Sequence, residues 1–245
     1  MPKTNSPKKI KYICLPEAEL PPSTEDFRTT SSWRIFRIMS EFVDGFEFVA
    51  DLKNSVAFFG STRASWEEKS YRDAQMLANL LAKDGFTIVT GGGPGIMEAA
   101  NKGALAAGGE SVGINIQLPG GQLANEYVTK SLGFHYFFTR KVMFSFACHV
   151  YVFFPGGFGT LDEFFEMVTM VQTKKLSNPV RVVVVGKEYW GGLINWLEKE
   201  AVEKRKAIKK EEMKIINIAD TPEEAYKLIK SFAGNHNMMD KNSGK

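Results

Sequence analysis

Between residues 25 and 233 the chain alternates short apolar runs with segments in which apolar residues recur at helical spacing. Over residues 31–52 an apolar side chain returns every three or four positions, which predicts one long amphipathic helix before the first strand. Several later runs are apolar throughout, as strands buried between two helix layers must be. The predicted strands are SVAFF (55–59), FTIVT (86–90), SVGINI (111–116), FHYFF (134–138), HVYVFF (149–154), VRVVVV (180–185) and KIINI (214–218).

Strands separated by helices predict an α/β fold, namely a Rossmann-like doubly wound parallel sheet of about seven strands with an extra N-terminal helix. The segments at the two ends are polar and rich in turn residues. They predict flexible tails at 1–24 and 234–245 around a single domain at 25–233. The charge-dense run 197–214 is interpreted as a solvated helix and turn.

The composition argues against several classes of partner. The 31 basic and 28 acidic residues give a net charge of +3, so no nucleic-acid-binding stripe is expected. The apolar run 12–15 is shorter than a signal core of about 7 to 15 residues. No run reaches the ~18 apolar residues of a membrane span. With only Cys14 and Cys148, a disulfide framework is not expected, and the cytoplasm is the predicted compartment.

A glycine-rich turn, GGGPGIME, lies between a predicted strand and a predicted helix. There, backbone N–H groups and the positive end of a helix dipole meet an anion. Ile96 breaks both the dinucleotide pattern G-x-G-x-x-G and the phosphate-loop pattern G-x-x-x-x-G-K, and Gln117 rather than an acid follows the next strand. Hydride transfer and NTP hydrolysis are therefore disfavoured. The loop glycines are Gly91, Gly92, Gly93 and Gly95.

The stretch FFPGGFGTLDE (153–163) repeats this design after a later strand, and a third candidate follows the first strand. In an open parallel sheet all three turns are expected along the same carboxyl edge, where ligands bind. One glycine loop is a weak signal because tight turns need glycine anyway, but three strand ends with this chemistry favour a phosphate-bearing ligand. The residues are Gly60, Ser61 and Thr62 after the first strand, and Gly156, Gly157, Gly159 and Thr160 in the later stretch.

Two carboxylates, Asp162 and Glu163, follow the later loop directly. One interpretation is structural, since Thr160 to Glu163 fits a capping box worth about 1 kcal/mol. The other is functional. A carboxylate roughly 8 Å from a phosphate, at an effective dielectric near 20, is repelled by about 2 kcal/mol per phosphate charge. That repulsion is tolerable if the carboxylate faces a different part of the ligand.

Arg140 is predicted to return to the same edge as Glu163. About nine helical residues after Arg140 descend roughly 14 Å, and the strand at 149–154 climbs back about 20 Å. An acid for water or sugar and a cation for the departing group form a hydrolytic pair. The alternative, that Arg140 is a surface arginine at a helix start, stays open.

Together these residues resemble the LOG family, the cytokinin riboside 5'-monophosphate phosphoribohydrolases, often labelled "lysine decarboxylase-like". Pro155 to Glu163 meets the motif P-G-G-x-G-T-x-x-E, Arg140 and Lys141 form the R-K pair, and the resemblance covers about residues 55–230. It implies a Rossmann-like sheet, subunits that pair as homodimers or assemble further, and a nucleoside monophosphate as substrate. The implied reaction hydrolyses the N-glycosidic bond of AMP or a cytokinin-type nucleotide to free base and ribose 5-phosphate.

The resemblance also implies residue roles. Glu163 would orient the ribose and activate water, and Arg140 would assist at the scissile bond. One departure is Glu98, which stands where plant members have the last glycine of G-G-G-x-x-G-L-M-G, so the preferred base stays open. The implied substrate-binding residues are Gly60, Ser61, Gly92, Gly93, Gly95, Lys141, Gly156, Gly157, Gly159 and Thr160.

No cofactor is expected. The sequence offers no lysine set for pyridoxal phosphate, and His135, His149 and His236 do not approach metal-ligand spacing. Two non-catalytic alternatives remain: a carrier of a phosphorylated ligand such as molybdenum cofactor, and a nucleotide sensor. In both, Glu163 is only a cap residue, and the protein binds its ligand without releasing a base.

Overall fold

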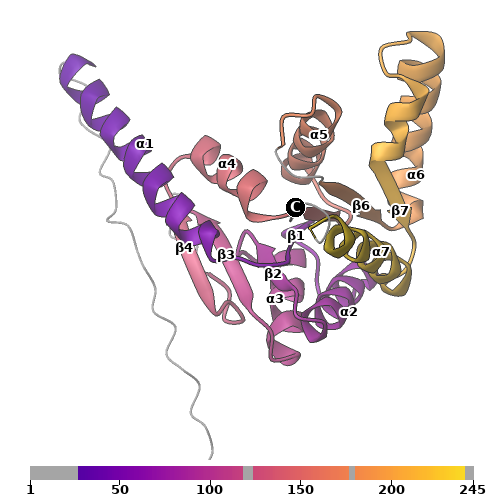
Figure 1. The fold of residues 1–245 in the computed structure, drawn as a ribbon, viewed down its shortest axis with the longest axis horizontal. Helices are drawn as coiled ribbons and strands as arrows, with labels where there is room; N and C mark the ends of the chain where they lie inside the picture. The colour runs from indigo at the N-terminus through magenta and orange to yellow at the C-terminus, as the bar shows by residue number, and fades with distance from the viewer. Residues whose placement is uncertain (1–26, 118–123, 177–179, 241–245) are drawn as a thin grey trace, which may run out of the picture.

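The computed structural model, drawn in Figure 1, describes residues 27–117, 124–176 and 180–240. Within these residues seven parallel strands form one sheet in the order β4-β3-β2-β1-β5-β6-β7, which confirms the predicted α/β class. The strands are β1 (Ser55–Phe59), β2 (Thr87–Thr90), β3 (Ser111–Ile116), β4 (Lys130–Phe134), β5 (Val150–Phe153), β6 (Arg181–Val185) and β7 (Ile216–Ala219).

The winding of the chain reverses at the centre of the sheet. From β1 it proceeds outward to β4, then returns to place β5 on the other side of β1 and continues to β7. Val56 pairs with Val150 and Phe59 with Phe153, so β1 and β5 end together. In an open parallel sheet the crevice outside the carboxyl ends at such a switch point is the usual ligand site.

Helices cover both faces of the sheet (Figure 1). Side chains alternate along each strand, so Val56 and Phe58 enter one core while Ala57 and Phe59 enter the other. On the first face lie α2 (Lys69–Lys83), α3 (Ile96–Ala106) and α7 (Pro222–Asp240); on the second lie α1 (Phe27–Ala50), α4 (Phe137–Ala147), α5 (Phe158–Gln172) and α6 (Lys187–Trp196).

Beyond α6 the chain continues as a π-helix, η1 (Leu197–Lys204), and later a 3-10 helix, η2 (Lys210–Ile215), before β7. The predicted solvated helix and turn at 197–214 corresponds to this segment, most of whose side chains are not buried. In the described part of the chain, no helix combines the length and apolar character that crossing a membrane requires.

One predicted strand is wrong. The segment 134–138 was expected to be β because aromatic residues favour strands, but Phe134 ends β4 and Phe137 begins α4. The N–H groups of His135 and Tyr136 donate to the carboxylate of Glu41. Phe137 is exposed rather than buried in the sheet.

The helix predicted at 31–52 forms as α1, shifted a few residues toward the N-terminus. α7 continues to Asp240, past the predicted domain boundary at 233. The predicted N-terminal tail, 1–24, lies outside the described residues.

Candidate active site

The loop between β5 and α5 presents an open helix start. Gly157 is the N-cap of α5, no side chain caps the helix, and its first turn contains no acid. The N–H groups of the first turn have no acceptor within a helix. A Cβ added to Gly157 or Gly159 would meet nothing within 4 Å. Space and free backbone donors together give this loop the properties of an anion site.

The predicted capping box at Thr160 is wrong. Thr160 lies inside the first turn of α5 and its side chain is packed against Gly156, where an added Cβ would come within 2.7 Å of the Thr160 Cβ. The S/T-x-x-E pattern therefore fits the sequence but not the start of the helix. Consequently Glu163 is not the capping partner of Thr160, and its burial needs another explanation.

The loop after β1 is tied to the loop after β5. The Ser61 N–H donates to the Pro155 carbonyl at 3.0 Å, and the Ser61 carbonyl accepts from the Ile96 N–H at 3.0 Å. Gly60 has no room for a side chain because Ile96 lies 2.6 Å from a Cβ added there. Gly60 and Ser61 therefore join the carboxyl ends of β1, β2 and β5 into one rigid edge.

The glycine loop 91–95 is filled by protein groups. The Gly92 N–H donates to Thr90 Oγ1 at 2.8 Å, and the Gly92 and Gly93 carbonyls accept from the backbone and side-chain amides of Asn125 at 2.8 and 2.9 Å. Gly95 has a φ of 71° and faces the backbone of the 61–62 turn. Unlike the α5 loop, this loop offers little open space.

Two side chains lie on the outer surface of the 91–95 loop. The Arg140 guanidinium occupies the space that a Cβ at Gly91 would take, and the Asn115 amide lies 2.6 Å from a Cβ added to Gly92. The sequence did not single out Asn115, whose Oδ1 is buried with no hydrogen-bond partner among the described residues. The glycines thus permit a close approach of Arg140 and Asn115 to the loop.

Arg140 lies in the first turn of α4 and is held from several sides. Its Nε donates to the Ile114 carbonyl at 2.7 Å, and its guanidinium lies 5.1 Å from the centre of the Phe144 ring. Burial lowers the pKa of Arg140, while the charge of Glu163 raises it. The guanidinium is therefore an anchored cation beside a carboxylate, not a surface arginine.

Glu163 is 8% exposed on the buried side of α5. Burial raises its pKa to about 7; the positive charges of Lys141 and Arg140 act in the opposite direction, and the neighbouring Glu166 reinforces the rise. Arg140 and Glu163 each change the pKa of the other, so their charges interact across this part of the protein. A carboxyl group with this pKa can both hold and release a proton near neutral pH.

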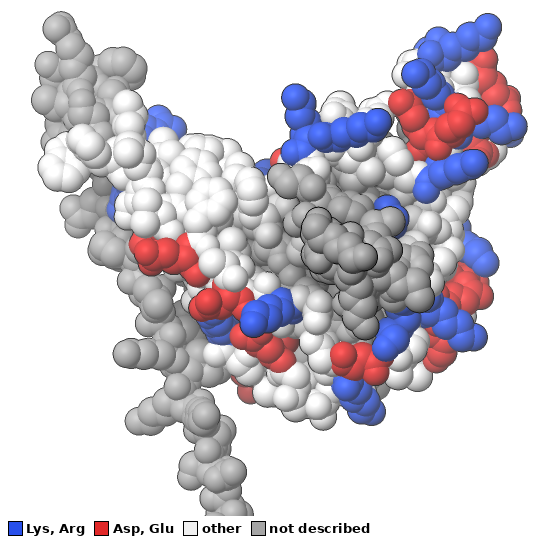
Figure 2. All heavy atoms as spheres, in the orientation of Figure 1, with Lys and Arg blue, Asp and Glu red and all other residues white. Residues whose placement is uncertain are grey.

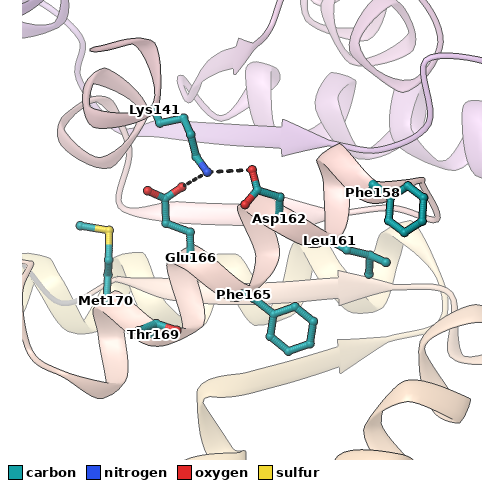
Figure 3. Close-up of a pocket in the computed structure, with 8 residues that line it drawn as sticks. All are labelled: Lys141, Phe158, Leu161, Asp162, Phe165, Glu166, Thr169 and Met170. Carbon is teal, nitrogen blue, oxygen red and sulfur yellow. Dashed lines mark hydrogen bonds and ion pairs between the residues drawn. The ribbon is translucent and has the colours of Figure 1, made fainter. Parts of the chain in front are cut away.

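Lys141 points toward α5 rather than toward the glycine loops. Its Nζ forms ion pairs of 2.8 Å with Asp162 and with Glu166 (Figure 3). Burial lowers the pKa of Lys141, but its hydrogen bonds to the two carboxylates outweigh this and raise it above the ordinary value. Glu166 was not predicted, although its position three residues after Glu163 places it on the adjacent face of α5.

A shallow hollow of about 760 Å³ lies along α4 and α5 around this ion-pair cluster (Figure 3). Arg140 and Glu163 are not among its lining residues, so the hollow lies next to these two side chains and does not enclose them. Phe158, at its edge, is 93% exposed. The lining residues are Lys141, Phe158, Leu161, Asp162, Phe165, Glu166, Thr169 and Met170.

Glu98, the departure noted in the first glycine loop, is engaged by a tyrosine. It accepts a 2.9 Å hydrogen bond from the Tyr71 hydroxyl, and Tyr71 is buried. Burial first, and then the Glu98 contact, raise the pKa of Tyr71 well above its ordinary value. Glu98 thus places a negative charge in the first turn of α3, where it would oppose a bound phosphate.

Metal-binding and thiol chemistry find little support in the side chains. Across residues 27–117, 124–176 and 180–240, no group of three or more His, Cys, Asp or Glu residues is arranged to hold a metal ion. Cys148 is buried, and burial raises the pKa of its thiol to about 12. Cys14 lies outside the described residues.

Comparison with known proteins gives one family and one fold. The family described as "Possible lysine decarboxylase" matches residues 97–229. The chain is 29% identical over 142 residues to the probable cytokinin riboside 5'-monophosphate phosphoribohydrolase LOGL5 of Oryza sativa subsp. japonica. The aligned segment covers 54% of this chain and 55% of that protein. It is 29% identical over 182 residues to the cytokinin riboside 5'-monophosphate phosphoribohydrolase LOG3 of Arabidopsis thaliana, covering 73% and 82%.

Among solved structures, the molybdenum cofactor carrier protein MCP from Chlamydomonas reinhardtii superposes with a TM-score of 0.55 at 20% identity, over 74% of this chain and 99% of that one. At this identity the likeness concerns the fold alone. The matched segment spans about half the length of LOGL5 but most of LOG3.

Proposed function

The chain belongs to the family described as possible lysine decarboxylases, here of the LOG type, and on that premise we propose that it is a nucleoside 5'-monophosphate phosphoribohydrolase. The reaction would hydrolyse the N-glycosidic bond of AMP or of a cytokinin-type nucleotide to free base and ribose 5-phosphate. One observation carries the proposal: Glu163, a buried carboxyl group on α5, has a pKa of about 7, and its charge interacts with that of the Arg140 guanidinium.

The phosphate would bind at the start of α5. Gly157 and Gly159 leave room for it, and the N–H groups of the first turn are available as donors. The loop 91–95 is less suited to a phosphate, because Glu98 follows it and protein groups already fill it. It would instead provide the surface against which Arg140 packs. This division gives the two glycine loops separate tasks.

The ionised form of Glu163 would accept a proton from water as the water oxygen attacks the anomeric carbon. The bond between that carbon and the base nitrogen breaks, its electron pair goes to the base, and the proton is passed on to the departing base. Arg140 would stabilise the negative charge that builds on the leaving base. Lys141 would act indirectly, since its charge lowers the pKa of Glu163.

The test is the release of base and ribose 5-phosphate from a panel of nucleoside monophosphates. Native protein is expected to release the two products in equal amounts. Glu163→Gln should lower kcat by about a hundred- to ten-thousand-fold while leaving monophosphate affinity in place. Glu203→Gln, an exposed glutamate on η1, is the matched control and should behave like the native protein.

Two results would contradict the hydrolase. If the native protein binds monophosphates without releasing base, a carrier or sensor becomes the better account. If Glu163→Gln retains full turnover, another group must activate the water.

We also infer that the protein functions as a homodimer or a higher homo-oligomer, through the face formed by α1, α4, α5 and α6. Of the seventeen large apolar side chains that are exposed among the described residues, thirteen come from these four helices. Figure 2 shows the resulting uncharged surface over α1 and α4, with charged side chains gathered around it. Apolar patches of this kind mark interaction sites.

Light scattering should give twice the 27.4 kDa chain mass, or a larger multiple. The double variant Trp33→Ser, Phe36→Ser, on the exposed side of α1, should shift the mass toward one chain. A native monomer at all concentrations would overturn the inference. The cytoplasmic location stays a prediction from the sequence.

A further inference from the structure

Glu41 is a buried carboxylate with an unusual set of partners. It lies on α1, is 3% exposed, and accepts three hydrogen bonds from residues more than ninety positions away. The donors are the His135 N–H at 2.7 Å, the Tyr136 N–H at 3.4 Å and the Thr139 hydroxyl at 2.5 Å. A charge buried this deeply is costly unless its hydrogen bonds serve a purpose.

All three donors belong to the start of α4. Tyr136 is the N-cap of this helix, and its side chain makes no capping hydrogen bond. Glu41 therefore supplies the cap from another helix and places a negative charge at the positive end of the α4 dipole. The ion pairs found among the described residues do not include Glu41, whose carboxylate is held by hydrogen bonds from the start of α4.

A second contact fixes α1 against α4 one turn further on. A Cβ added to Gly45 would overlap the Met143 side chain, with Met143 Cγ at 2.8 Å and Phe134 Cε1 at 3.2 Å. The two helices thus meet without space between them at Met143, and through Glu41 at Thr139. Arg140 lies between these two attachment points.

We infer that Glu41 is a positioning residue for Arg140. It fixes the first turn of α4 so that the guanidinium reaches the Ile114 carbonyl and packs against Gly91. Without this cap the first turn frays, and the Arg140 backbone loses the register that its N–H keeps with the Tyr136 carbonyl at 3.3 Å. The inference deepens the proposed function and rests on it, because it assigns what holds the reacting cation in place.

The pKa of Glu163 provides a measurable test, because it would not change if Glu41 were only a structural cap. Facing it are Arg140 and Lys141 from α4, Glu166 from α5 and the buried Tyr151 from β5. The charge of Arg140 lowers the pKa of Glu163. If Arg140 moves away while the other three stay, the pKa of Glu163 must rise.

The experiment is a titration of Glu163 by NMR on protein carrying ¹³C-labelled glutamate, with Glu163→Gln used to assign the signal. In the native protein the midpoint is expected near pH 7. In Glu41→Gln one of the two acceptor oxygens becomes an N–H donor that faces backbone donors, and the midpoint should rise by about 0.5 pH units. Glu47→Gln, an exposed glutamate on the same helix, is the matched control and should not shift it.

Thr139→Val keeps the side-chain shape but removes the hydroxyl, which contacts both the Glu41 carboxylate and the Tyr136 carbonyl. This variant keeps the inference testable if Glu41→Gln fails to fold. It should shift the midpoint in the same direction by a smaller amount. In turnover assays Glu41→Gln should lower kcat by about tenfold with little change in KM, since a misplaced catalytic group affects the reacting state more than binding.

The outcomes separate the two proposals. If Glu41→Gln lowers only the melting temperature and leaves the Glu163 midpoint and kcat unchanged, Glu41 is a structural cap and the inference fails. If the native protein releases no base from any monophosphate, the proposed hydrolase fails, yet the titration still decides whether Glu41 positions Arg140.

Discussion

The two glycine loops of this protein share a sequence signature and differ in almost everything else. The loop before α5 has an uncapped helix start, no acid in its first turn and empty space at Gly157 and Gly159. The loop before α3 is hydrogen-bonded to its neighbours, is followed by Glu98, and lies under the side chains of Arg140 and Asn115.

The difference teaches that glycine in a strand-to-helix turn has two distinct uses. In one, the missing side chain leaves space for a ligand to approach the backbone; in the other, it leaves space for another part of the protein. Both uses look identical in a sequence. Substitutions that add a single methyl group can distinguish them, because the groups that the methyl would meet are different.

The largest effect is expected at Gly91. In Gly91→Ala the added methyl meets the Arg140 guanidinium and comes within 2.7 Å of Met97 Sδ, so the guanidinium must shift from its place against the loop. Turnover should fall by about a hundred- to ten-thousand-fold, as for loss of a catalytic group. Steady-state kinetics and calorimetric titration with inorganic phosphate check this. Lost phosphate affinity with retained turnover would show instead that the loop 91–95 is the cradle.

The second effect concerns the acid that follows the open loop. The pKa of Glu163 is about 7 in the folded protein against 4.5 as the ordinary value, so between these pH values the folded state binds more protons. Stability should therefore fall as pH rises from 4.5 to 7, and the penalty, about 3 kcal/mol, should persist above pH 7.

Urea unfolding of native protein and Glu163→Gln at several pH values measures this penalty. The variant should be the more stable protein above pH 7, and its advantage should vanish below pH 4.5. An advantage that does not change with pH would mean that Glu163 is not the titrating group.

A smaller effect is expected at Gly95 of the closed loop. Its φ of 71° strains any side chain, and an added Cβ would lie 2.9 Å from the Thr62 Cα. Gly95→Ala should lower the free energy of unfolding by about 2 to 3 kcal/mol. Gly85→Ala isolates the backbone contribution, because Gly85 has a φ of 83° with nothing near its Cβ position, and should cost about 1 kcal/mol. Equal losses in the two variants would remove the steric part of the argument.

The smallest effect on stability is expected at Gly157 of the open loop. Its φ of −93° suits alanine, and no atom lies within 4 Å of the added Cβ. Gly157→Ala should change the free energy of unfolding by less than about 0.5 kcal/mol. The methyl should nevertheless weaken phosphate binding about fivefold, because it occupies the approach to the N–H groups. Unchanged phosphate affinity would place the anion elsewhere.

Much of the fold was predictable because strands buried on both faces are apolar at every position, as in Val182 to Val185. The lengths of one helix and one strand predicted that Arg140 and Glu163 return to the same edge, and their charges do interact. The predictions that failed rested on local sequence patterns, and contacts with residues distant in the sequence determined the structure instead. FHYFF has strand propensity, but Glu41 captures its backbone N–H groups and starts a helix there.

The remaining features depend on three-dimensional detail that a sequence does not contain. Thr160 and Glu163 fit a capping box, yet α5 begins at Phe158, so Thr160 lies inside the first turn, packed against Gly156. Arg140 and Lys141 are adjacent in sequence, but consecutive helical residues point about 100° apart, so only Arg140 faces the glycine loops. The R-K sequence motif alone could not show that Arg140 contacts the glycine loop while Lys141 pairs with carboxylates of α5.

The pairing of β1 with β5 at the centre of the sheet also sets when the sheet can first be completed during synthesis. Val56 pairs with Val150, a separation of 150 − 56 = 94 residues, so the second strand leaves a ribosome roughly 5 to 20 seconds after the first at about 5 to 20 residues per second. Until then β1 can be joined only by β2 and the strands beyond it. In the nascent chain the edge of β1 that pairs with β5 therefore has no partner strand for a period that is long compared with most folding steps.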